Sequence, residues 1–311
     1  MTRIINYAII ETFISGYKYM LKVKKAHQEF IKNLKDKGRS PATVSSYDRH
    51  LEDLIMFLQE LKKDHVHMIT KNDLSGFINY LRKHGYTKKS IAAKATTAKT
   101  FFKFLEINEY ITSNPAIVLE DIKQEKKEIE PRILSTVEYR ALRDAASEDL
   151  RNYAVIELLL QTGIKIGELT RIRLTDVYFK KSQTLAKLTI RNTKEKVERI
   201  IPLNMSAEKA INNYLKIRPK TLEKTLFVTK TGHKLLIRNI RVFIKKYYKK
   251  AGITNARVHD LRHTFCAHHL KKGTSLLIVA KMAGHKKLAT TEKYLSLIKK
   301  EQEDQIEKNA L

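Results

Sequence analysis

The chain has 311 residues, 42% of them hydrophobic, which makes it long enough for two domains and too apolar for a disordered protein. Its 61 Lys and Arg residues against 33 Asp and Glu give a net charge of +28, which favours a polyanion such as nucleic acid as the partner. No apolar run approaches the roughly 18 residues of a membrane span, and the single cysteine, Cys266, excludes an internal disulfide framework.

The first 118 residues predict an N-terminal extension over 1–24 and an all-α helical bundle over 25–118. Ser40 before Pro41 predicts a helix start, because serine caps free N–H groups and proline suits the first helical turn. Thr70 with Asp73 predicts another start. Four helices with one apolar stripe each are expected, over 26–37, after Pro41, after Thr70 and over 87–107.

A charged segment over 119–132 separates the bundle from the rest of the chain. From residue 120 it runs EDIKQEKKEIEPR, with no apolar face long enough to bury, so it is expected to be a linker. Residues 125–311 hold 40 basic and 20 acidic residues, against 21 and 13 in residues 1–124. Most of the excess positive charge therefore belongs to the second half, although a lysine-rich composition that only serves solubility is an alternative.

Residues 133–311 predict an α+β domain that is mostly helical with a small antiparallel sheet, so the fold class is mainly α. Ser135 and Glu138 form a capping-box pattern at a helix start. The expected elements that follow are an apolar helix over 153–161, a hairpin of strands over 185–191 and 197–203, a short strand over 226–229, and helices from 238 to the end.

Four segments of this domain carry candidate chemistry. They are QTGIKIGELTRIRLTDV (161–177), TKEKVERIIPL (193–203), HDLRHTF (259–265) and AGHKKLATTEKYL (283–295). In order and spacing they resemble the tyrosine recombinase (phage integrase) family, over about residues 25–311. A simple Xer-like or transposon-resolving type is favoured, because no further N-terminal DNA-binding domain with strands is evident.

The residue types fit metal-free phosphodiester cleavage. Such cleavage needs cations around the phosphate oxygens, a nucleophile, and an acid for the leaving oxygen. Tyrosine can be the nucleophile, arginine donates two hydrogen bonds to phosphate, and histidine can donate or accept a proton near neutral pH. Lysine can protonate the leaving hydroxyl.

The resemblance implies roles for individual residues. Tyr294, nine residues after His285, matches the family's nucleophile, and His285 after Gly284 matches a histidine that hydrogen-bonds the phosphate. His259 and Arg262 match the family's His-x-x-Arg. Three residues apart on a helix, these two share a face and can reach one phosphate.

The general acid is expected at the tip of the hairpin. The family has a lysine eight residues before a proline that ends the second strand, which here is Lys194 before Pro202. Lys196 is the alternative, and a hairpin tip with solvated lysines is the third possibility.

Lys165 departs from the family pattern, because it stands where the family has its first catalytic arginine. Lysine keeps the charge but cannot donate the paired hydrogen bonds of a guanidinium. Arg171, six residues on, is rotated by about 240° on a helix and should not replace it. The lysine is either a substitution that traps a complex or a natural variant with weakened chemistry. Glu168 matches an acid that orients this cation.

A metal site is an alternative role for the histidine-rich stretch, which contains His259, His263, Cys266, His268 and His269. It lacks a second cysteine pair and a His-Glu-x-x-His pattern, so no metal is expected. His263 and Cys266 are expected to pack within a helix. The chain also has no glycine-rich phosphate loop, so neither ATP nor another cofactor is expected.

The resemblance as a whole implies a site-specific DNA recombinase. It would cleave and rejoin double-stranded DNA through a 3′-phosphotyrosine in a tetramer, with the bundle and the catalytic domain on opposite sides of the duplex and the C-terminal tail docked on a neighbouring protomer. The expected location is cytoplasmic and nucleoid-associated, without membrane contact. The alternatives are a non-catalytic DNA-binding or accessory protein and a type IB topoisomerase-like enzyme.

Overall fold

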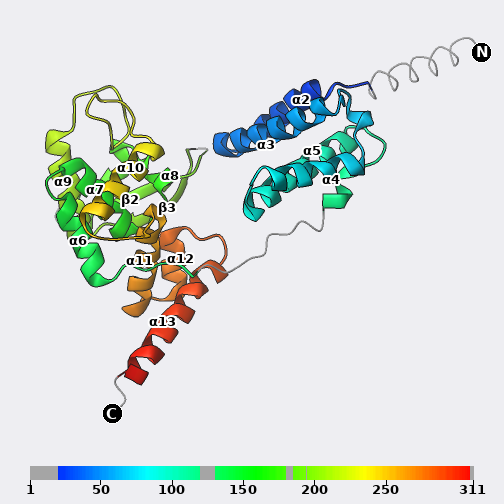
Figure 1. Cartoon of the computed structure of the whole chain (residues 1–311). Helices are drawn as coiled ribbons and strands as arrows, with labels where there is room; N and C mark the ends of the chain where they lie inside the picture. The colour runs from blue at the N-terminus through cyan, green and yellow to red at the C-terminus, as the bar shows by residue number, and fades with distance from the viewer. Residues whose placement is uncertain (1–19, 120–129, 180–184, 194, 309–311) are drawn as a thin grey trace, which may run out of the picture. The chain divides into compact units, whose positions relative to one another are not determined.

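A computed structural model describes residues 20–119, 130–179, 185–193 and 195–308, with side chains up to residue 299 (Figure 1). The chain divides into two compact units, residues 1–127 and 128–311. Each unit is described by itself. Most of the predicted extension over 1–24 and of the predicted linker over 119–132 lies outside the described residues.

The first unit is a helical bundle, as predicted. It contains α2 (Val23–Asp36), α3 (Pro41–Glu60), α4 (Lys71–Lys83) and α5 (Lys88–Ile107), with short 3-10 turns at Val66–Met68 and Pro115–Leu119. The predicted caps are confirmed: the Ser40 hydroxyl accepts the N–H of Thr43, and Thr70 and Asp73 cap each other reciprocally. The helices bury a core that includes Phe30, Leu54, Leu58, Leu74, Phe77, Phe101 and Leu105.

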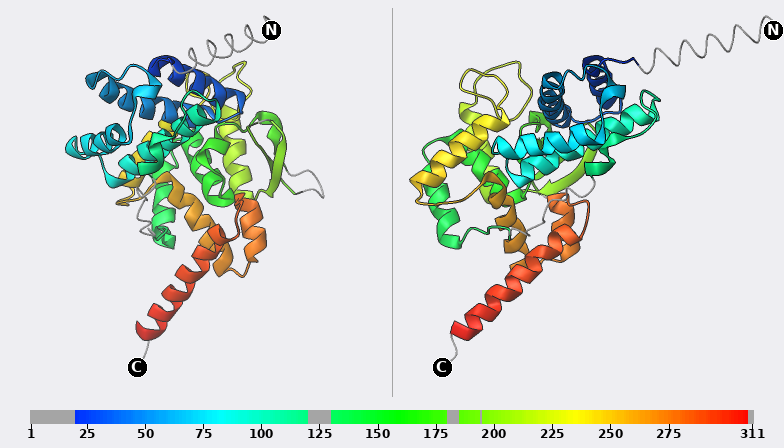
Figure 2. Two further views of the ribbon diagram at one scale, coloured as in Figure 1. Left: turned by 90° about the vertical axis from the view of Figure 1, so that its right-hand side faces the viewer. Right: turned by 45° about the vertical axis from the view of Figure 1, so that its right-hand side comes forward.

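The second unit is also mainly helical. Its helices are α6 (Thr136–Ala146), α7 (Leu150–Thr162), α8 (Ile166–Leu169), α9 (Met205–Ile217), α10 (Ile237–Lys250), α11 (Val258–Lys271), α12 (Leu276–Ala283) and α13 (Ala289–Lys308). The capping box of Ser135 and Glu138 opens α6 as predicted. Both views of Figure 2 show α13 projecting away from the rest of this unit.

Helix α7 is the centre of the second unit. It contacts α6, α8, α9, α10 and α11, and nearly every residue of its last three turns is buried. Even Glu157 on this helix is fully buried, where its carboxylate pairs with the guanidinium of Arg143 from α6. The end of α7 therefore provides a fixed platform from which α8 begins.

A three-stranded antiparallel sheet, in the order β1-β2-β3, completes the unit. The strands are β1 (Val177–Tyr178), β2 (Lys187–Arg191) and β3 (Val197–Pro202), after a 3-10 turn at Leu174–Asp176. Leu188 faces Ile201 across the β2–β3 pair, which confirms the predicted hairpin. β1 was not predicted, because two residues give no alternation to detect.

The strand predicted over 226–229 is wrong. Within the described residues this stretch makes only an isolated bridge, between Val228 and Lys234. Its backbone groups bind a mixture of loop backbone and side chains: the Leu226 N–H donates to the Ile172 carbonyl at 2.7 Å, and the Val228 N–H donates to the Tyr214 hydroxyl at 3.1 Å. The apolar run therefore predicted correctly that these residues are buried, but it did not predict which groups their backbone would bind.

Among the described residues, no helix has the length and apolar character needed to cross a membrane.

Candidate active site

The first part of the site is built where α7 ends. Gly163 adopts a left-handed conformation with φ of +61°, and a Cβ there would lie 2.2 Å from the Phe265 ring of α11. Only glycine therefore allows α7 and α11 to approach this closely. Two residues later Lys165 is the N-cap of α8, and its charge helps to lower the pKa of His259 on α11.

Helix α11 contributes His259 and Arg262. Arg262 is 2% exposed, and its Nη1 donates to the carbonyl of Gly163 at 2.7 Å and to the carbonyl of Ala283 at the end of α12. Burial lowers the pKa of this guanidinium. Burial, followed by the charge of Arg262, also lowers the pKa of the His259 imidazole, which favours its neutral form at pH 7.

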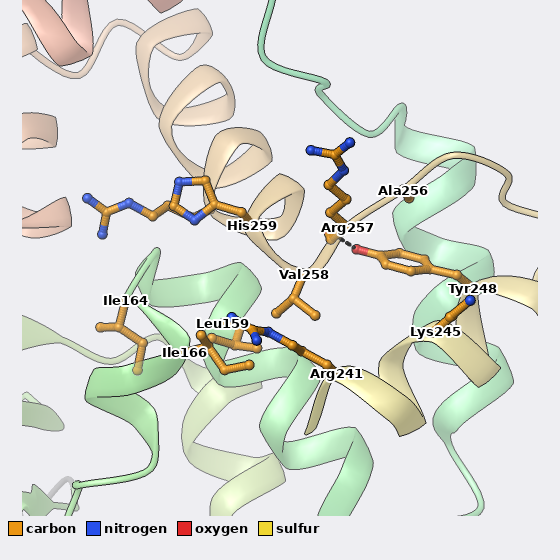
Figure 3. Close-up of a pocket in the computed structure, with 11 residues that line it drawn as sticks. Leu159, Ile164, Ile166, Arg241, Lys245, Tyr248, Ala256, Arg257, Val258 and His259 are labelled. Carbon is orange, nitrogen blue, oxygen red and sulfur yellow. Dashed lines mark hydrogen bonds between the residues drawn. The ribbon is translucent and has the colours of Figure 1, made fainter. Parts of the chain in front are cut away.

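His259 and Arg262 line the same pocket of about 670 Å³. Figure 3 shows Arg241 and Lys245 of α10 on its opposite wall from His259, with Arg257 at the start of α11. The Tyr248 hydroxyl donates to the Arg257 carbonyl at 3.1 Å and holds that start in place. No carboxylate is among the described lining residues, so the pocket suits an anion.

The turn between α12 and α13 contributes His285. Gly284 ends α12 with φ of +70°, and the N–H of His285 then donates to the Ala280 carbonyl at 2.9 Å. His285 Nδ1 lies 2.7 Å from the Thr291 hydroxyl. Burial, together with the charges of Arg262 and Lys165, lowers the pKa of His285 to about 4. The imidazole of His285 is therefore mostly neutral at pH 7.

Tyr294 lies on α13 and is only 2% exposed. It packs in a small core with Phe265, Cys266 and Val279, and its hydroxyl lies 2.7 Å from His263 Nδ1. Its ring stacks near that of His285, with 6.4 Å between the centroids. Burial raises the pKa of the tyrosine hydroxyl, so the nucleophile candidate is protonated and closed off in this state.

Lys165 is the half-exposed cation of the group. Its ammonium lies 3.4 Å from the Gly284 carbonyl and 3.9 Å from Glu168 Oε1. Its backbone N–H donates to Glu168 Oε2 at 2.9 Å. The carboxylate has a closer partner in Arg199 of β3, whose two terminal nitrogens bind both oxygens at 3.2 and 2.8 Å.

Of the two lysines considered at the hairpin tip, Lys194 lies outside the described residues. Lys196 is exposed, and its N–H donates to the side-chain oxygen of Asn192 at 3.2 Å. The choice between them as general acid remains a prediction. Arg171 follows the end of α8. Its Nε is buried and has no hydrogen-bond partner in the described part of the chain.

The structure thus gathers His259, Arg262, His285, Lys165 and Tyr294 from four elements. Sequence analysis missed Arg199 and the contact of His263 with Tyr294. Strand alternation gave a signal for Arg199, because it lies on the buried face of β3 with Ile201. Among the described residues, no group of three or more His, Cys, Asp or Glu side chains could hold a metal ion.

Two family models match the sequence. Residues 126–301 match the phage integrase family, and residues 28–108 match the phage integrase N-terminal SAM-like domain. Among curated proteins, the chain is 32% identical over 279 residues to tyrosine recombinase XerC of Thermodesulfovibrio yellowstonii, covering 85% of this chain and 89% of the relative. It is 31% identical to tyrosine recombinase XerD of Staphylococcus saprophyticus, covering 88% and 94%.

Solved structures share the fold. A XerH site-specific recombinase bound to a palindromic difH substrate aligns with a TM-score of 0.71 and 16% identity, covering 90% of this chain and 82% of that one. A lambda integrase dimer bound to a core site aligns with a TM-score of 0.68 and 18% identity, covering 87% and 97%.

Proposed function

Since the chain belongs to the phage integrase family and is a tyrosine site-specific recombinase, we propose that it cleaves and rejoins double-stranded DNA through a 3′-phosphotyrosine formed at Tyr294. The observation that carries this proposal is the convergence of two cations, two neutral histidines and one tyrosine at the junction of α8, α11 and α13. Each residue type matches one requirement of metal-free phosphoryl transfer.

The phosphate is held first. Arg262 and Lys165 neutralise the non-bridging oxygens, with the imidazoles of His259 and His285 as further donors. Arg241, Lys245 and Arg257, which line the same pocket as His259 and Arg262, bind flanking phosphates of the same strand. The energy of binding is electrostatic, which agrees with the net charge of +28.

The bonds then exchange in line. The Tyr294 oxygen forms a bond to phosphorus, the bond from phosphorus to the 5′ oxygen breaks, and a neutral histidine, His259, accepts the tyrosine proton. Lys194 protonates the leaving 5′ oxygen. Attack by the 5′-hydroxyl of a partner strand reverses these steps and restores the tyrosine, so no external energy source is needed.

Strand exchange requires more than one protomer. The proposed assembly is a tetramer on two DNA sites, held by docking of the α13 tail on a neighbouring protomer. α12 offers a suitable acceptor surface, because Leu277 and Ile278 are exposed at 70% and 52%. The proposed division of labour is a DNA-binding domain over 25–118 and a catalytic domain over 133–311.

One observation favours a second candidate, a non-catalytic DNA-binding protein. Lys165 offers a single ammonium where paired hydrogen bonds would stabilise the transition state best. Such a protein would bind the same DNA without forming a covalent bond to it.

The test begins with duplexes that the protein selects from a randomised pool, each then nicked beside the centre of the bound site so that cleavage cannot be reversed. We expect a covalent protein–DNA adduct that survives denaturing electrophoresis. Tyr294→Phe abolishes the adduct and leaves the mobility shift in native gels. Tyr178→Phe, on exposed β1, is the matched control and keeps it. Binding without any adduct from the unaltered protein would establish the non-catalytic alternative.

A further inference from the structure

Arg199 is a buried cation for which the proposed chemistry has no role. It lies on the inward face of β3, and its side chain is 4% exposed. Its side chain contacts Glu168 of α8 and two carbonyls at the end of α12, with a longer ion pair of 3.8 Å to the adjacent Glu198. A buried charge without a specific task is rare, because removing it from water is unfavourable unless several groups pair with it.

The guanidinium of Arg199 links two elements that carry site residues. It binds both oxygens of Glu168 on α8, and its Nε and Nη2 donate to the carbonyls of Met282 and Ala283 at 2.8 and 3.3 Å. These carbonyls belong to the last turn of α12, where backbone oxygens have no partner within the helix. One side chain thus connects the start of α8 to the end of α12.

The turn that follows α12 is shaped around this side chain. A Cβ on Gly284 would lie 2.7 Å from the guanidinium carbon of Arg199, so a glycine is needed for the guanidinium to fit. His285 is the next residue. The carbonyl of Ala283 also accepts from Arg262, so Arg199 and Arg262 share one acceptor on the two sides of the turn.

The contact between Arg199 and Glu168 also determines how closely the Lys165 ammonium can approach Glu168. Because Arg199 occupies both oxygens of Glu168, the Lys165 ammonium stays 3.9 Å from the nearer one and 47% exposed. Its only described hydrogen bond goes to the Gly284 carbonyl at 3.4 Å. The lysine is therefore left available to an incoming phosphate.

We propose that Arg199 is a positioning residue for strand cleavage: it holds the Gly284–His285 turn against Glu168 and thereby sets His285 and Lys165 relative to Arg262. This inference rests on the proposed function. In this chain the guanidinium that pairs with Glu168 comes from Arg199 of β3, whereas the cation at the start of α8 is Lys165.

The test compares Arg199→Lys with Arg143→Lys. Arg143 also pairs with a buried carboxylate, that of Glu157, in the same unit but on α6. In both cases the substitution keeps the positive charge but removes the bidentate hydrogen bonding that a guanidinium can make to a carboxylate. We expect Arg199→Lys to slow adduct formation on the nicked duplex about ten- to a hundredfold, because misplacement by about 1 Å has effects of that size. The dissociation constant for the same DNA should stay within about twofold. Arg143→Lys should change neither quantity.

A second readout separates positioning from general destabilisation. In the unaltered protein the His285 imidazole should titrate near pH 4 in histidine-labelled NMR spectra. In Arg199→Lys the pKa of His285 should rise toward about 6.5, the ordinary value of an exposed histidine, while the titration of His50 in the first unit stays unchanged. The double variant Arg199→Met with Glu168→Met removes both charges, which proteins often tolerate, and should fold and still cleave slowly.

Equal cleavage rates for Arg199→Lys and Arg143→Lys, with an unchanged His285 titration, would overturn the inference. That result differs from failure of the proposed function, in which the unaltered protein itself forms no adduct.

Discussion

The two halves of the candidate site, the anion-binding residues and the proposed nucleophile, differ in how accessible they are to a substrate. Arg262 and His259 of α11 line a pocket that an anion can enter, and the ammonium of Lys165, before α8, is half exposed. Tyr294 on α13 is buried and protonated, and its hydroxyl is hydrogen-bonded to His263. The anion-binding half therefore has exposed cations and an open pocket, whereas the proposed nucleophile is buried and is expected to need release before it can react. On the proposed mechanism, we expect the rate of cleavage to depend both on how well the phosphate is bound and on release of α13.

The largest effect should come from improving the anion-binding half. Lys165→Arg would add a second hydrogen bond to the phosphate in the transition state, worth about 2–4 kcal/mol. Adduct formation should therefore accelerate about thirty- to a thousandfold, because each 1.4 kcal/mol is a factor of ten. DNA affinity should change little, since the net charge is the same. Single-turnover cleavage of the nicked duplex measures the rate of adduct formation, and the mobility shift in native gels measures the affinity for DNA.

Lys165→Ala is the companion variant and should slow cleavage further by removing the cation. A rate for Lys165→Arg equal to or below that of the unaltered protein would show that the site, with Arg199 on Glu168, is adapted to lysine.

A smaller effect should come from loosening the nucleophile half. His263→Phe removes one hydrogen-bond partner of the Tyr294 hydroxyl at similar volume and leaves Cys266 as the other, which destabilises the closed state by about 0.5–1.5 kcal/mol. If release of α13 limits the rate, adduct formation should accelerate about two- to tenfold. His268→Phe, on the exposed face of the same helix, is the control. A strong decrease would instead make His263 the proton acceptor for Tyr294 and contradict the comparison.

The smallest effect concerns stability against acid. Burial holds the pKa of both His263 and His285 near 4, whereas the unfolded chain binds these protons near pH 6.5. Between these values the unfolded state binds more protons, so stability is complete above about pH 6.5 and falls as pH decreases toward 4. The Tm of the second unit's transition should therefore drop between pH 7.5 and 5 in scanning calorimetry.

His263→Phe removes one of these two groups and should reduce the dependence of Tm on pH. An unchanged slope in that variant would mean that the buried imidazole is not a source of the acid sensitivity.

The parts of this fold that the sequence predicted have local causes. The caps at Ser40, Thr70 and Ser135 depend on residues three positions apart, and they formed as expected. The hairpin of β2 and β3 is likewise a local pairing. The strand predicted over 226–229 failed because its backbone partners, such as Arg218 and Tyr214, come from outside any strand.

The site divides in the same way. Resemblance to the family's motifs, in their order and spacing, nominated Tyr294, His259, Arg262, His285 and Lys165, and the structure brings them together. The spacing could not reveal that Arg199 would bind Glu168, 31 residues earlier, or that His263 would meet Tyr294, 31 residues later. Those contacts depend on how β3 and α13 pack on α8 and α11, which only the tertiary structure determines.

The most direct test of the account is to identify the amino acid that becomes attached to DNA. The adduct trapped on the nicked duplex would be digested with trypsin and nuclease, and the peptide that carries the residual nucleotide sequenced by mass spectrometry. The account predicts a single modified peptide with the phosphate on Tyr294, among the 14 tyrosines of the chain. Attachment at any other residue would contradict it.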